Sequence, residues 1–240
     1  MPGTAGAPSA TRLMRVARRT ARGYNRYGSA IPLSNPAMTS PVQLTPAVLR
    51  ESLARTAPPP DARDLHMSFI PAGAKATEAA VLVPIVNRKG ALQVLLTQRT
   101  SHLSDHAGQI SFPGGRVELE DASREDTALR ETEEEIGLAR TRVTIVGRLP
   151  LYEIPSGFRI TPIVGWVEPP FDLKLDAFEV ASVFEAPLAH FVDAGRYQRR
   201  EYRFKGRHRH YMAIPYQGRY IWGATAGMLY SLARMLNANG

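Results

Sequence analysis

The sequence predicts an α/β fold in which helices cover both faces of one mixed β-sheet. Apolar runs of strand length recur along the chain, and the clearest are residues 81–86 and 159–167. Residues 224–236 instead have the spacing of a helix with one apolar face, as does a stretch that ends at Gly137. Strands and helices do not follow a strict β–α–β order, so a mixed sheet is expected.

A short helix is predicted before the first strand. Thr45 is a favourable N-cap residue and Pro46 is tolerated in the first helical turn, so this helix should begin there and run to about Arg55. The prolines at 58–60 should end it.

Two hairpins are predicted further along the chain. The apolar run 81–86 and residues 92–99 both have strand character, and the turn residues 87–90 between them end in a glycine. Residues 197–204 and 208–214 flank a short basic turn in the same way.

The remaining segments are shorter. Residues 110–112 and 143–149 have strand character. Residues 180–184 and 188–192 lie on either side of Pro187, and this arrangement predicts a short helix with a loop.

The net charge of +8 belongs almost entirely to the first 50 residues. They contain seven arginines and no acidic residue, whereas the remaining 23 basic and 22 acidic residues nearly cancel. We therefore predict a disordered Arg-rich leader over residues 1–41 and one domain, with an N-terminal helical extension, over residues 42–240. The expected location is the cytoplasm, or an organelle if the leader is a transit peptide.

Composition disfavours several classes of function. The absence of cysteine excludes thiolate chemistry and fits a reducing compartment, and no apolar run is long enough to cross a bilayer. Basic and aromatic residues alternate over 196–210, but a half-buried strand requires the same alternation, so no specific nucleic-acid partner is expected. His208 and His210 lack a third ligand nearby and are not interpreted as a metal site.

The most informative stretch is an acidic helix. Glu131, Glu134 and Glu135 are spaced i, i+3 and i+4, which places them on one helical face, while Arg130 is expected to point off that face. Like charges at this spacing destabilise a helix, so a compensating group is expected. Oxygen ligands suit Mg²⁺ or Mn²⁺, and the alternative is a solvated acidic surface.

A glycine loop before the helix favours the metal interpretation. Phe112 leads through a proline into Gly114 and Gly115, where missing side chains allow the backbone to approach a metal or a phosphate closely. Asp121 or Ser123 is then expected to cap the helix N-terminus.

These residues together resemble the signature of the Nudix hydrolases, which cut nucleoside diphosphates linked to another group. The pattern Arg130-Glu131-x-x-Glu134-Glu135-x-Gly137 matches the second half of that signature. In the first half Ala122 occupies the usual Glu position, and the acidic residue is one position earlier.

The upstream sequence is similar to one subfamily, the coenzyme A pyrophosphatases. The similarity lies in residues 95–100 and 108–115 and in the position of Asp121. The resemblance covers roughly residues 79 to 236. It implies an α/β/α sandwich with a mixed sheet.

The resemblance also implies the residues of the site. Arg130, Glu131, Glu134 and Glu135 would be catalytic, and Mg²⁺ or Mn²⁺ would be held by those three glutamates and the Gly115 carbonyl. Arg130 would pair with Asp121 and hold the loop against the helix. The candidates for substrate binding are Arg99, Ser104, Gly108 and Phe112, and Ser104 stands where the subfamily usually has Arg.

The expected partner is a small nucleotide-derived molecule, coenzyme A or its acyl derivatives. Two alternatives stay open, namely another nucleoside diphosphate derivative such as ADP-ribose and a scaffold that senses a nucleotide without cutting it. The general base also stays open between Glu134, Glu168 and Glu179.

Overall fold

The structure of the protein, a computed structural model, describes residues 44–55, 70, 74–89, 91–102, 107–204 and 207–237. The predicted leader over 1–41 and the substrate candidate Ser104 lie outside these residues. Within the described residues, no helix is long and apolar enough to span a membrane.

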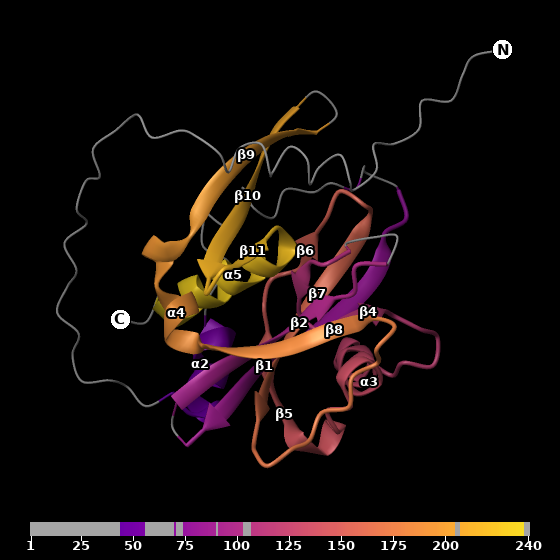
Figure 1. The fold of residues 1–240 in the computed structure, drawn as a ribbon, viewed down its shortest axis with the longest axis vertical. Helices are drawn as coiled ribbons and strands as arrows, with labels where there is room; N and C mark the ends of the chain where they lie inside the picture. The colour runs from indigo at the N-terminus through magenta and orange to yellow at the C-terminus, as the bar shows by residue number, and fades with distance from the viewer. Residues whose placement is uncertain are drawn as a thin grey trace. The chain divides into compact units, whose positions relative to one another are not determined.

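The main sheet is mixed, as predicted. Its central path is β3–β2–β1–β7–β5, in which β1 and β2 form the predicted antiparallel hairpin and β1 and β7 run parallel (Figure 1). Three more strands join this path, because β4 pairs with β1, β6 with β7 and β8 with β2. The strands are β1 (Thr77–Arg88), β2 (Ala91–Arg99), β3 (Ile110–Ser111), β4 (Gly114–Arg116), β5 (Val143–Arg148), β6 (Tyr152–Glu153), β7 (Phe158–Val167) and β8 (Val180–Pro187).

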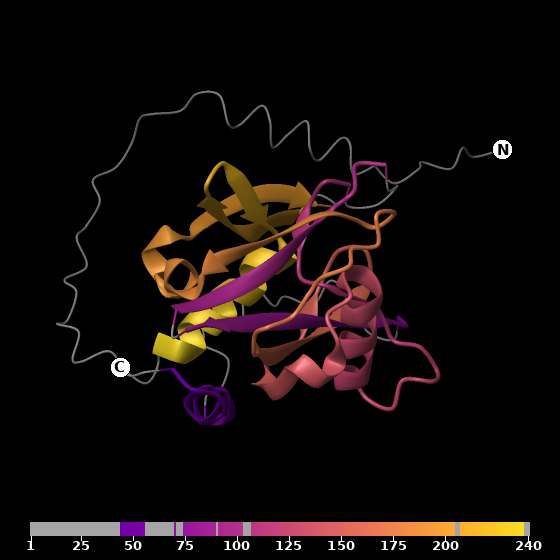
Figure 2. The ribbon, with the colours of Figure 1, turned by 60° about the horizontal axis from the view of Figure 1, so that its bottom comes forward.

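Each face of this sheet has its own apolar core. Successive side chains of a strand point to opposite faces, and in β1 Val83 and Ile85 enter one core while Leu82 and Val86 enter the other. Helices α2 and α5 pack on the first core and α3 on the second, and α3 and α5 are well separated in both views (Figures 1 and 2). These helices are α2 (Pro46–Arg55), α3 (Arg124–Ile136) and α5 (Ala224–Asn237). The α/β class with helices on both faces is confirmed.

The predicted N-terminal helix is part of this packing. The Val48 N–H donates to Thr45 Oγ1 at 3.3 Å, so Thr45 caps α2 as expected. Leu49 and Leu53 are buried in the core. A Cβ atom added to Gly147 of β5 would lie 2.8 Å from Leu53 Cδ1, so the glycine allows α2 to approach the sheet closely.

The second predicted hairpin belongs to a separate sheet of three strands. Its order is β11–β10–β9, with antiparallel pairing throughout, and the β9–β10 hairpin projects at the top of Figure 1. The Thr225 hydroxyl at the start of α5 donates to the Ile110 carbonyl at 3.0 Å, which ties α5 to β3. The strands are β9 (Gln198–Phe204), β10 (Arg207–Tyr216) and β11 (Arg219–Trp222).

The region around Pro187 differs in part from the prediction. Leu188–Val192 forms the expected short helix, α4, but residues 180–184 belong to strand β8 and not to a loop. β8 pairs antiparallel with β2, and Phe184 stands opposite Leu96. Only two of the eight β8 residues are buried, four are half-buried and two are exposed, so the apolar alternation that identifies a strand is weak there. In the part of the chain that the structure describes, the 3₁₀ helices are η2 (Arg140–Arg142) and η3 (Ala194–Arg196).

Candidate active site

Both ends of the acidic helix α3 are closed by local contacts. Ser123, and not Asp121, is the N-cap, and its hydroxyl accepts the Asp126 N–H at 3.1 Å. Gly137 ends the helix in the left-handed conformation with φ 70°, and its N–H donates to the Glu133 carbonyl. The direction of the glutamates on α3 is therefore fixed from both ends.

The glycine loop lies directly against this helix. β4 places Gly115 opposite Ala80 of β1. A Cβ atom added to Gly115 would lie 2.3–2.5 Å from the Glu131 carboxylate, so only glycine lets the loop backbone reach that position. The Gly114 N–H donates to Glu135 Oε2 at 3.3 Å. The backbone of the glycine loop is thus in direct contact with the carboxylates of Glu131 and Glu135 on α3. We call these two segments the loop–helix unit.

The pair that the resemblance implied between Arg130 and Asp121 is present. Arg130 Nε donates to Asp121 Oδ1 at 2.8 Å and its Nη2 donates to Oδ2 at 3.0 Å. The Asp121 carboxylate also accepts the Glu118 N–H and the Thr127 hydroxyl, and its side chain is only 2% exposed. The Arg130 guanidinium holds the pKa of Asp121 well below its usual range. Arg130 Nη2 also donates to the Arg116 carbonyl at 3.1 Å, so the pair joins loop to helix.

Arg130 does more than the sequence predicted. Its Nη1 donates to Glu131 Oε1 and to Glu134 Oε2, each at 3.1 Å. The expectation that Arg130 points off the acidic face is therefore wrong. The side chain is long enough to contact Asp121 and the acidic face at once, which helical spacing alone does not reveal.

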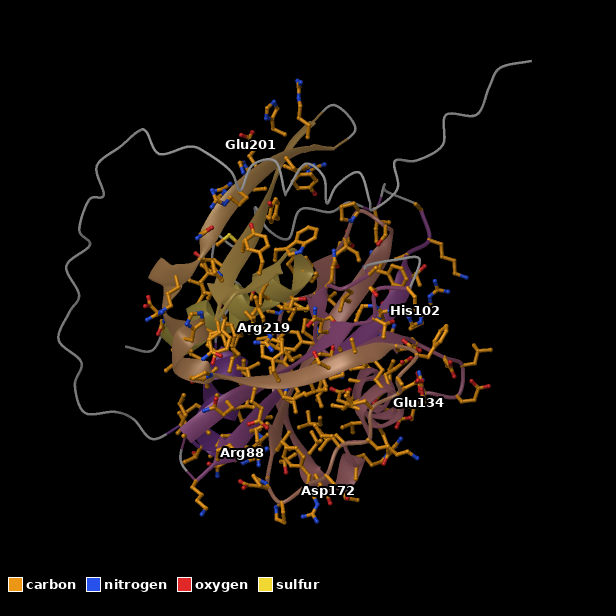
Figure 3. All side chains as sticks on the ribbon, viewed as in Figure 1. Arg88, His102, Glu134, Asp172, Glu201 and Arg219 are labelled. Carbon is orange, nitrogen blue, oxygen red and sulfur yellow. The ribbon has the colours of Figure 1, made fainter. Side chains whose placement is uncertain are left out.

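The three glutamates of that face have different surroundings. Glu135 is 6% exposed, whereas the Glu134 side chain is 60% exposed and stands beside α3 in Figure 3. Burial raises the pKa of Glu135 to about 8; the Gly114 N–H and Arg99 oppose the rise, while Glu179 and Glu131 add to it. Burial also raises the pKa of Glu131. The negative charge at Glu135 is thus poorly compensated by the chain itself.

One cation and one further carboxylate complete the cluster. Arg99 Nη1, at the end of β2, lies 3.9 Å from Glu135 Oε1 and 3.9 Å from Glu179 Oε2. These distances are too long for hydrogen bonds. Arg99 Nε is buried and has no hydrogen-bond partner among the described residues. The Arg99 side chain is 26% exposed, so its guanidinium can turn to an incoming anion.

Two of the candidate general bases, Glu179 and Glu168, lie in different parts of the structure. Glu179 shares Arg99 with Glu135, but Glu168 accepts the Asn87 side-chain N–H at 3.3 Å, at the far end of β1. Gly114 pairs with Val81, and the six residues from there to Asn87 span roughly 20 Å at about 3.3 Å each. Glu168 is therefore too distant to act with the acidic face.

The donor set fits a hard divalent cation. Glu131, Glu134, Glu135 and the adjoining Gly115 backbone offer only oxygen ligands, and the close approach at Gly115 leaves room for no side chain there. Among the described residues, no three acidic or histidine side chains are already gathered around one point. Arg130 instead holds Glu131 and Glu134. Binding a cation would require these two carboxylates to turn from Arg130.

The predicted substrate residues fall into separate groups. Arg99 lies at the cluster, as described. Gly108 has φ 68°, which favours glycine, but no atom of the described residues lies within 4 Å of an added Cβ, so close packing against them is not the reason for it there. Phe112 is 3% exposed in the apolar core, which corrects its prediction as a substrate contact. Its apolar side chain packs inward because the glycines after it, and not Phe112, face the acidic helix.

Sequence reasoning did not single out Thr127 or Phe178. Thr127 is buried and donates to Asp121 Oδ2 at 2.8 Å, so it supports the Arg130 pair. Phe178, next to Glu179, is 65% exposed. Neither the Thr127 hydrogen bond nor the position of Phe178 has a local sequence signal, since both depend on which segments meet in space.

Comparisons with known proteins show what this chain is similar to. The model of the NUDIX domain matches residues 76–186. An uncharacterized Nudix hydrolase NudL of Escherichia coli (strain K12) is 43% identical over 157 residues, which span 65% of this chain and 81% of that protein. A protein of the same description from Shigella boydii serotype 18 has the same identity and coverage. A crystal structure of a Nudix hydrolase from M. smegmatis, RenU, is 16% identical with a TM-score of 0.45, over 68% of this chain and 86% of that one.

Proposed function

The chain belongs to the Nudix hydrolase family and is a pyrophosphohydrolase, and on that premise we propose that it hydrolyses the diphosphate bond of coenzyme A or acyl-coenzyme A. The products would be adenosine 3′,5′-bisphosphate and (acyl) 4′-phosphopantetheine. The observation that carries the hydrolytic part is Glu135, a buried carboxylate whose charge the described residues leave poorly compensated. The coenzyme A part is supported by the upstream stretches 95–100 and 108–115.

In this proposal the protein ligands of Mg²⁺ or Mn²⁺ are Glu131, Glu134, Glu135 and the Gly115 carbonyl. A divalent cation would offset the negative charge of the diphosphate and make a nearby water more acidic. Arg130 has two roles in the proposal. It holds the loop to the helix through Asp121, and it keeps Glu131 and Glu134 in place until they turn to the cation.

Glu179 is our choice for the general base. Its carboxylate lies 3.9 Å from Arg99 Nη1, as does that of Glu135, and it is 42% exposed, so water can reach it. In this role a Glu179 carboxylate oxygen accepts the proton of the attacking water. Glu134 is less suited because in this proposal its carboxylate is a ligand of the cation.

Arg99 is proposed to bind the diphosphate. Its Nη1 lies 3.9 Å from each of two carboxylates but is hydrogen-bonded to neither, so it can donate to a phosphate oxygen without losing a bond. A phosphate bound there would lie beside both Glu135 and Glu179.

The test is a substrate panel with product identification. Purified protein would be assayed with Mg²⁺ or Mn²⁺ on coenzyme A, 3′-dephospho-coenzyme A and ADP-ribose. We expect cleavage of coenzyme A to the two products named above, loss of activity in EDTA and recovery on adding metal. Efficient cleavage of ADP-ribose alone would contradict the coenzyme A assignment and leave the hydrolase chemistry intact. Nucleotide binding without cleavage of any compound would favour a sensing role.

A further inference from the structure

An exposed aromatic side chain belongs to the residue directly before Glu179. Phe178 is 65% exposed, although large apolar side chains are normally buried. The ring of His102 lies beside it, with centroids 4.9 Å apart and planes tilted by 58°. His102 follows the end of β2 and is labelled in Figure 3 on the same side of the view as Glu134. Two π-systems from distant parts of the sequence therefore meet at one surface.

The backbone that carries Phe178 is firmly held. The Phe178 N–H donates to Asp176 Oδ1 and its carbonyl accepts the Thr100 hydroxyl, both at 2.8 Å. The Thr100 N–H donates to the Glu179 carbonyl at 3.0 Å. The Asp176 N–H donates to the carbonyl of Glu135, one of the proposed ligands, at 2.9 Å. The segment is thus tied both to β2 and to the end of α3, and the backbone from which the ring projects is held in place.

This position is adjacent to the reaction site. Phe178 and Glu179 are consecutive, so their Cα atoms are about 3.8 Å apart. Glu179 is 3.9 Å from Arg99, the proposed diphosphate contact. A substrate whose diphosphate lies at Arg99 can therefore extend its next flat group over Phe178.

We propose that His102 and Phe178 form the base-binding subsite of this enzyme, in which the purine ring of a nucleoside diphosphate substrate stacks. This inference rests on the proposed function, because the diphosphate at Arg99 sets where the base can reach. A flat aromatic ring accepts a base by stacking and tolerates different bases. The imidazole of His102 adds a polar edge that can hydrogen-bond to a ring nitrogen. The subsite selects substrates that carry a base over diphosphates that lack one.

Binding can be measured without turnover. The probe is 2-aminopurine riboside 5′-phosphate, a fluorescent nucleotide with no diphosphate bond to cleave, whose emission falls when its base stacks. We expect quenching by the native protein. Phe178→Leu, which keeps an apolar side chain but removes the ring, should bind the probe roughly ten-fold more weakly, about 1.4 kcal/mol. Phe178→Trp should retain the quenching.

Two controls separate stacking from other effects. Tyr220→Ala removes an aromatic side chain that is 42% exposed on β11 and should leave both quenching and hydrolysis unchanged. Ribose 5-phosphate has the phosphate without the base, and its inhibition constant should be equal for native protein and Phe178→Leu. The melting temperature of each variant verifies the fold.

Steady-state kinetics of Phe178→Leu test the base-binding subsite separately from the proposed hydrolysis. Phe178→Leu should raise KM for the nucleotide substrate roughly ten-fold and change kcat less than about two-fold, as for a contact equally strong in ground and transition states. Unchanged KM and unchanged quenching in Phe178→Leu, with hydrolysis intact, would overturn the subsite alone. Quenching that depends on Phe178 in a protein that cleaves no diphosphate would support the subsite and overturn the proposed hydrolysis.

Discussion

Asp121 and Glu135 are two buried carboxylates of the same loop–helix unit, yet their surroundings act in opposite directions. Asp121 accepts two hydrogen bonds from Arg130 and others from Glu118 and Thr127, and its pKa is held low. Glu135 accepts one backbone N–H at 3.3 Å, has its nearest cation at 3.9 Å, and has a pKa raised to about 8. One charge is neutralised within the chain and the other is not.

The difference separates a structural carboxylate from a functional one. A buried charge destabilises a fold unless it is paired. Arg130 pairs with Asp121, and this pair holds the glycine loop against α3. The chain leaves Glu135 for a partner from outside, which in our account is the divalent cation of the hydrolase. Removing the Asp121 charge should therefore lower stability, whereas removing the Glu135 charge should lower activity and leave the fold intact.

The largest expected effect is on activity in Glu135→Gln. Glutamine keeps the size and can still accept the Gly114 N–H, but it is a neutral ligand, so kcat should fall about a thousand-fold or more while the fold persists. The matched control is Glu133→Gln on the same helix. Glu133 is exposed and faces Arg140, and its substitution should change kcat less than about two-fold. Near-normal turnover of Glu135→Gln at saturating metal would show that this carboxylate is not a ligand.

Asp121→Asn should lower stability instead. It breaks a buried charge pair and leaves Arg130 with only its contacts to Glu131 and Glu134, so the free energy of unfolding should fall by about 3 kcal/mol in urea denaturation. The control is Glu125→Gln, which removes a more exposed pair with Arg148 and should cost less than about 1 kcal/mol. Equal losses in the two variants would mean that the Asp121 pair has no special structural role.

The stability difference between native protein and Asp121→Asn should depend on pH, because the pKa of Asp121 is lowered in the folded protein. A carboxylate whose folded pKa lies below its unfolded value, about 4, stabilises the fold above that value, and the stabilisation is lost as pH falls toward the folded pKa. The stability gap between native protein and Asp121→Asn should therefore be constant from about pH 5 to 8 and narrow below about pH 4. A gap that grows as pH falls would contradict the pairing.

A smaller effect is expected for Glu179→Gln. Loss of a general base should lower kcat about a hundred-fold with little change in KM. Glu168→Gln serves as the control, because Glu168 lies at the far end of β1 beside Asn87. If the two variants were equally active, Glu179 would not be the base.

Much of this comparison could be predicted from the sequence. Helical spacing and the glycine loop located the acidic face, and Gly137 marked the end of its helix, because these signals are local. The sequence could not show that Glu135 is buried and Glu134 exposed. That difference depends on how α3 lies against β4, which is a tertiary contact.

The errors have the same origin. Residues 180–184 were predicted outside a strand, since β8 gains its identity from pairing with β2 and not from its own pattern. Phe112 was assigned to the substrate, but its side chain fills the core. Phe178 went unnoticed because only the folded chain brings it to His102. Local periodicity predicts elements, whereas neighbours from distant strands decide which side chains a site can use.

The most direct test of the contrast is thermal unfolding of native protein and Glu135→Gln near pH 7.5, first in EDTA and then with increasing Mn²⁺. Without metal, folding must either bury the Glu135 charge without a cation or protonate the carboxylate, because burial raises its pKa to about 8, so Glu135→Gln should melt at the same or a higher temperature. Since a ligand that binds only the folded state stabilises it, Mn²⁺ should raise the melting temperature of the native protein clearly and that of the variant little, reversing their order. A variant that melts lower in EDTA, or that gains as much from Mn²⁺ as the native protein, would contradict the account.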